Sequence, residues 1–91
     1  MEEMKVKVKC LLLKNDTVLV SEIVEIGSEL GEPDCKLTNP YKLKDDGILG
    51  IHLEPWITFT DQSEIMIHSD SILTIVDPSE TIFKLYYDLI S

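Results

Sequence analysis

The 91-residue chain contains no arginine: its eight basic residues are all lysine, against seventeen acidic residues, and its net charge is −9. Arginine supplies the bidentate phosphate contacts and the stacking on which many nucleic-acid sites depend. A negative field also repels a polyanion unless basic residues are clustered. The one cluster, Lys5, Lys7 and Lys9, alternates with apolar residues on one face of an expected strand. It is either a solvated face or, repeated in an oligomer, a basic belt.

Long hydrophobic runs are also missing. No apolar stretch reaches the ~18 residues of a membrane-spanning helix, and the N-terminal MEEMKVKVK has no apolar export signal. We therefore expect a cytoplasmic protein without membrane contact, in which Cys10 and Cys35 are reduced and packed as small apolar side chains. The length predicts a single domain over residues 1–91. A domain of this size has a thin core, and oligomerisation commonly adds to its stability.

Signatures of catalysis and metal binding are absent as well. His52 and Glu54, even combined with His68 or Asp70, lack the regular spacing that makes a metal site convincing. Residues 68–71 (HSDS) hold the residue types of a nucleophilic triad, but neighbours on one turn cannot normally form its geometry. No phosphate-cradling glycine loop is present. We expect no enzyme, no cofactor and no metal.

What the chain does contain is a series of short apolar segments separated by turn residues. Alternating or Val- and Ile-rich runs predict strands over residues 5–13, 17–26, 35–44, 48–60, 64–68 and 71–76. Residues 14–16 (KND), 45–47 (DDG) and 69–70 (SD) supply turns. Pro40 is expected to bend the third segment, and Pro55 to kink or divide the fourth. The pattern indicates a compact antiparallel meander.

The C-terminal segment changes to a helical period. Asp77 as cap, Pro78 at the first helical position and Glu80 three residues after the cap predict a helix over residues 78–90. One polar stripe runs along this helix, and apolar side chains cover almost all of the remaining surface. So wide an apolar arc predicts two contacts, one with its own domain and one with a neighbouring subunit.

The order of these segments resembles the Sm-like (LSm) family. The stretches LLLKNDTVLVSEIVEI, DCKLTN and EIMIHSDSILTIV are similar to the two-part signature of that family, and the whole chain resembles small Sm-like proteins encoded by tailed phages. The resemblance implies a mainly β fold, a small bent five-stranded antiparallel Sm-like barrel, here with a C-terminal α-helix. It also implies a homo-oligomeric ring closed by the last two strands, with a subunit interface at Ile65, Ile67, Ile72 and Ile75.

The resemblance further implies RNA as a partner. The RNA-contacting positions of the family fall on Glu32, Asp34, His68 and Ser69, and all four depart from the family pattern. Two are carboxylates that would face a polyanion, and no planar side chain remains at the stacking position. His68 can still donate a hydrogen bond and can become charged at mildly acidic pH.

Two functions therefore stay open. One is a ring that binds RNA as a non-catalytic chaperone or scaffold; the other is a ring-shaped protein-interaction module without RNA binding. For the second, Trp56, Pro55, Tyr41 and the apolar helix offer anchors of the kind enriched at interfaces, although the same residues could equally serve the core or a subunit contact. Salt distinguishes the two functions, because phosphate contacts weaken steeply with ionic strength and apolar contacts do not.

Overall fold

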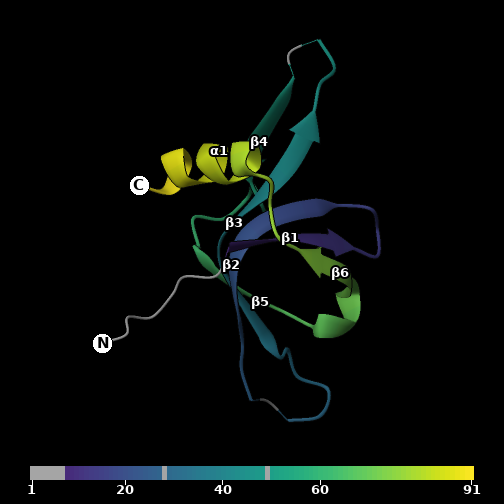
Figure 1. The fold of residues 1–91 in the computed structure, drawn as a ribbon. Helices are drawn as coiled ribbons and strands as arrows, with labels where there is room; N and C mark the ends of the chain where they lie inside the picture. The colour runs from purple at the N-terminus through teal and green to yellow at the C-terminus, as the bar shows by residue number, and fades with distance from the viewer. Residues whose placement is uncertain (1–7, 28, 49) are drawn as a thin grey trace, which may run out of the picture.

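The computed structural model describes residues 8–27, 29–48 and 50–91, and the fold is mainly β with one C-terminal helix, as expected (Figure 1). The strands are β1 (Val8–Leu13), β2 (Val18–Glu25), β3 (Cys35–Asp45), β4 (Ile51–Pro55), β5 (Glu64–Ile67) and β6 (Ile72–Val76). A short 3₁₀ turn, η1 (Ser69–Ser71), joins β5 to β6, and the helix is α1 (Glu80–Ile90). All strand pairs are antiparallel.

The sheet has six strands, as the apolar segments predicted, and it stays open, whereas the family resemblance implied five strands closed into a barrel. Its order is β4-β3-β2-β1-β6, with β5 paired to β3. Among the described residues, β6 pairs only with β1 and β5 pairs only with β3. One edge of each strand is therefore unpaired, and the chain does not close the sheet by itself.

The difference in strand number arises at β3, which has two partners along its length. Its C-terminal half pairs with β4, in the register Tyr41↔Pro55 to Asp45↔Ile51, and its N-terminal half pairs with β5. Asn39 lies between the halves with φ of +55°, and the β2–β3 register shifts nearby. The predicted strand over residues 48–60 is therefore shortened to β4, because the chain leaves the sheet after Pro55 and returns only at β5.

Pro40 bends β3 without ending it. The Trp56 backbone N–H donates to the Pro40 carbonyl oxygen at 3.0 Å, and the Asn39 N–H donates to the Ser63 carbonyl oxygen at 2.7 Å. These two bonds fasten the segment after β4 to the bend. A proline is tolerated within a strand where its missing N–H coincides with an irregularity of this kind.

The core lies inside the curl of the sheet. One buried cluster contains Leu11, Leu13, Leu19, Cys35, Leu37 and Ile67, and the half-buried side chains of Ile23, Trp56 and Ile72 pack against it. Cys10 and Cys35 are both free thiols, and burial raises the pKa of each.

The helix starts two residues later than the sequence predicted. Its cap is Ser79, whose Oγ accepts a hydrogen bond from the Ile82 N–H at 3.2 Å. Asp77, the predicted cap, instead forms an ion pair with Lys9 on β1. Because a serine hydroxyl caps a helix about as well as a carboxylate, the carboxylate is available to anchor the connection between β6 and α1.

Tyr86 attaches the helix to the bend of β3. Its fully buried side chain donates from the hydroxyl to the carbonyl oxygens of Asn39, at 2.9 Å, and Thr38, at 3.2 Å. Its ring meets Tyr41 edge-on, with 5.9 Å between ring centroids. Burial raises the Tyr86 pKa to about 12, so the hydroxyl stays protonated as a donor at neutral pH. The side chains of Phe83, Leu85, Tyr87 and Leu89 remain exposed, and the predicted second contact of the helix remains a prediction.

Removing the Tyr86 hydroxyl should destabilise the fold. We expect Tyr86→Phe to lower the free energy of unfolding by about 1–2 kcal/mol, because two carbonyl acceptors at a buried position lose their donor. Tyr87→Phe is the matched control. Tyr87 is 55% exposed, and removal of its hydroxyl should change the free energy of unfolding by less than about 0.5 kcal/mol. Urea unfolding of both variants measures the difference, and equal effects would contradict this role of Tyr86.

Candidate functional site

The four positions carried over from the Sm-like resemblance come together in one pocket. Glu32 and Asp34 lie in the loop between β2 and β3, and His68 and Ser69 lie where β5 passes into η1. All four line a pocket of about 340 Å³. The sequence separates the two pairs by more than thirty residues, and the pairing of β5 with the start of β3 brings them together.

A carboxylate clasp joins the two sides of this pocket. One Asp34 oxygen accepts a hydrogen bond from the Ser69 backbone N–H at 2.7 Å, and the other accepts from the Ser69 hydroxyl at 2.7 Å. These bonds hold the pKa of Asp34 below its usual range, mainly through the Ser69 hydroxyl, with a smaller contribution from the charge of His68. The role of Asp34 that the geometry supports is therefore to fix the position of the turn.

The electrostatics of the pocket are acidic. Its wall contains four carboxylates, from Glu29, Glu32, Asp34 and Asp70, and one imidazole, from His68. Such a wall attracts cations and hydrogen-bond donors and disfavours a phosphate backbone. The charge of this pocket therefore opposes RNA binding.

The predicted basic face is only partly visible. Lys5 and Lys7 lie outside the described residues. Lys9 lies on β1, and its ammonium group forms the ion pair with Asp77, which lowers the pKa of that carboxyl. The one described member of the cluster is thus already engaged in a contact between β1 and the segment before α1.

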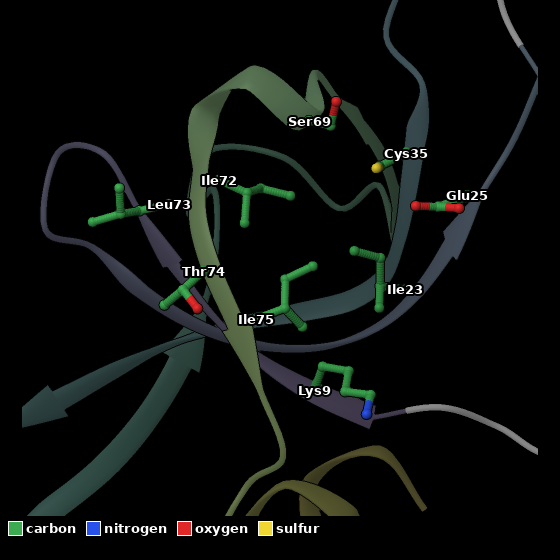
Figure 2. Close-up of a pocket in the computed structure, with 9 residues that line it drawn as sticks. All are labelled: Lys9, Ile23, Glu25, Cys35, Ser69, Ile72, Leu73, Thr74 and Ile75. Carbon is green, nitrogen blue, oxygen red and sulfur yellow. The ribbon is translucent and has the colours of Figure 1, made fainter.

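A second, more apolar pocket of about 440 Å³ lies inside the open side of the sheet (Figure 2). Ile72 and Ile75 point into it from β6 and Ile23 faces them from β2, while Leu73 points away. Sequence reasoning missed this pocket because it exists only where the sheet fails to close, and no local pattern encodes that gap.

The four predicted interface residues divide between two environments. Ile65 and Ile67 on β5 are buried in the core of their own chain, whereas Ile72 is half-buried and Ile75 exposed beside the second pocket. Their role in a subunit interface stays a prediction. The side chains of Ile72 and Ile75 are accessible to a neighbour; those of Ile65 and Ile67 are not.

The residues weighed as metal ligands do not converge. His52 Nδ1 lies 3.3 Å from an Asp46 carboxylate oxygen, and Glu54 lies 3.7 Å from the Lys44 ammonium. Within the described ranges, no group of three or more His, Cys, Asp or Glu side chains could hold a metal ion. In that same part of the chain, no helix has the length and apolarity to span a membrane.

The clasp predicts how stability responds to acid. Because the folded-state pKa of Asp34 is lowered, its stabilising contribution is complete above the unfolded-state value of about 3.9 and is lost as pH falls through the lowered value. We expect Asp34→Asn to melt at a lower temperature at neutral pH and to lose less stability than the unmodified chain on acidification. Asp70→Asn removes the same charge from the same pocket and should leave the acid response nearly unchanged. Thermal melts followed by circular dichroism across this pH range test the clasp, which is refuted if the two variants behave alike.

Comparison with known proteins gives a family without a described activity. No curated protein matches the chain. A family model described as a family of unknown function (DUF6561) matches residues 6–91. Because this match spans nearly the whole chain, the protein belongs to that family of unknown function, DUF6561.

Proposed function

We propose that this chain is a ring-forming, non-catalytic Sm-like protein whose subunits join through the unpaired edges of β5 and β6. The observation that carries the proposal is that β5 and β6, which both have an unpaired edge, are separated only by the turn η1 in one curled sheet. Among the described residues β4 also pairs with one strand only, but it lies at the other end of the sheet order from β6. An edge of this kind is a template for pairing with another chain. When β6 of one subunit pairs with β5 of the next, both edges are satisfied, and repetition of this head-to-tail contact closes a ring.

The composition of β6 supports this assembly. Leu73, Ile75 and Val76 are 61%, 45% and 53% exposed in the single chain, so the strand presents apolar side chains on both faces. Addition of a neighbouring strand would cover part of this surface and continue the hydrogen-bonded ladder. The Sm-like barrel expected from the sequence would then be completed between subunits, and the open sheet is compatible with that arrangement.

Charge favours the protein-interaction function over RNA binding. Each subunit carries a net charge of −9, and a ring repeats the acidic pocket around its axis. A symmetric array of carboxylates suits a basic protein surface better than a nucleic-acid strand. We therefore propose a scaffold that binds other proteins as the leading function.

RNA binding is the second candidate, and one observation favours it. The four positions that contact RNA in the Sm-like family converge in a single pocket of this chain, with His68 able to become charged. On this hypothesis, binding should depend on the His68 imidazole, which can donate a hydrogen bond to a phosphate or a base.

Assembly can be tested at the edge of β6. We expect the unmodified protein to have a multiple of the 10.4 kDa chain mass, and Ile75→Lys to reduce it to the mass of one chain, because a buried ammonium opposes strand addition. Val24→Lys is the matched control, since Val24 is 52% exposed on β2, where it pairs with Lys36 of β3 and lies on neither β5 nor β6. Light scattering coupled to size-exclusion chromatography gives the masses. A single-chain mass for the unmodified protein, or no effect of Ile75→Lys, would remove the basis for the ring.

The two functions can be separated by salt and pH. With fluorescent oligo-U and oligo-A RNA, the scaffold hypothesis predicts no saturable change in anisotropy at low salt, at neutral or mildly acidic pH. Binding that appears at low salt, weakens steeply with ionic strength and is lost in His68→Ala would instead establish the RNA function.

A further inference from the structure

A small pocket at the bend of β3 combines two prolines with two aromatic side chains. It has a volume of about 230 Å³, and its walls are Asn39, Pro40, Tyr41, Pro55, Trp56 and Thr60, Asp61, Gln62, Ser63. Ordinary small-molecule sites measure about 300–1,000 Å³. The size therefore suits one or two residues of an extended chain better than a whole small molecule.

The pocket is built on fixed backbone. Tyr41 and Pro55 are direct partners in the β3–β4 ladder, and Trp56 follows with its N–H bonded to the Pro40 carbonyl oxygen at 3.0 Å. The far end of the loop is held by the bond from the Asn39 N–H to the Ser63 carbonyl oxygen. The backbone that carries Tyr41, Pro55 and Trp56 is thus fixed before any ligand arrives, which reduces the entropic cost of binding.

Two hydrogen-bond donors in this wall are open to solvent. Within the described parts of the chain, neither the Trp56 indole N–H nor the Tyr41 hydroxyl makes a side-chain hydrogen bond, although both side chains are half-buried. No buried side-chain N or O atom among the described residues lacks a hydrogen-bond partner, so these two donors are accessible from outside and can meet a ligand. A complementary ligand would supply acceptors and flat apolar faces.

We propose that this pocket binds a proline-rich segment of a partner protein in the polyproline II conformation, flanked by a lysine or arginine. Such a segment has no internal hydrogen bonds, so its carbonyl oxygens remain free to accept from Trp56 and Tyr41. Its proline rings pack into aromatic-lined grooves. Asp61 in the wall, together with the net charge of −9, favours a basic flanking residue.

The pocket chemistry argues against a nucleobase as the occupant. Stacking on Trp56 would bring the attached phosphate close to Asp61, and the pocket wall contains no lysine. The inference is also independent of ring assembly, because every residue in the wall belongs to one chain.

Trp56 is the single tryptophan of the chain, so its fluorescence reports on the pocket directly. We expect a lysine-flanked proline-rich decapeptide to shift the emission saturably. A peptide of the same charge, with alanine in place of each proline, should bind about tenfold more weakly, because it is not preorganised as polyproline II. Equal affinities for the two peptides, or no saturable shift with either, would overturn the proposal. A shift produced by oligo-U and by neither peptide would assign the pocket to nucleic acid instead.

Two variants separate a specific site from general attraction to an acidic protein. Asp61→Asn should weaken binding of the proline-rich peptide several-fold and reduce its salt dependence. Phe59→Ser alters a fully accessible side chain of the same loop that does not line the pocket, and should leave the affinity unchanged. Equal losses in both variants would contradict the assignment. The titration is repeated on Ile75→Lys, so that failure of the peptide site is distinguished from failure of the ring.

Discussion

The bend in β3 at Asn39 and Pro40 is the constraint on which the rest of the structure depends. It turns one long strand into two pairing surfaces, so that β4 and β5 occupy successive halves. The bent backbone also offers the carbonyl oxygens that anchor Tyr86 and Trp56. The position of the helix, the small pocket and the curl of the sheet therefore follow from one local irregularity.

The same bend relates the fold to its proposed function. Because β5 pairs with the start of β3, it brings His68 and Ser69 against the loop that carries Asp34, and the clasp between Asp34 and Ser69 fixes the turn into β6. That turn holds the unpaired edges of β5 and β6 in a defined relation. A closed ring requires a fixed angle and distance between the two strand edges that join the subunits. If the turn between these edges were flexible, the subunits could also form open chains of variable curvature.

Much of the fold could be predicted from local patterns, and the exceptions have physical causes. Apolar alternation located the strands, but the segment 48–60 was shortened because the chain leaves the sheet after Pro55 and rejoins it only at β5. The helix was predicted correctly apart from its cap, since nothing local reveals that Lys9, remote in sequence, would pair with Asp77. The family resemblance singled out Glu32, Asp34, His68 and Ser69, which the fold brings into one pocket. The apolar pocket beside Ile72 depends on an unclosed sheet, which no short sequence pattern encodes.

Amide hydrogen exchange on the assembled protein tests the central claim most directly, because it reports on the edges of β5 and β6 themselves. If these strands pair between subunits, their amide groups should be protected to an extent comparable with those of β2, which is paired on both sides within the chain. Outward-facing amides of β5 and β6 that exchange as fast as those of the exposed loops, in a sample that is nevertheless oligomeric, would show that the subunits join elsewhere and would contradict the account.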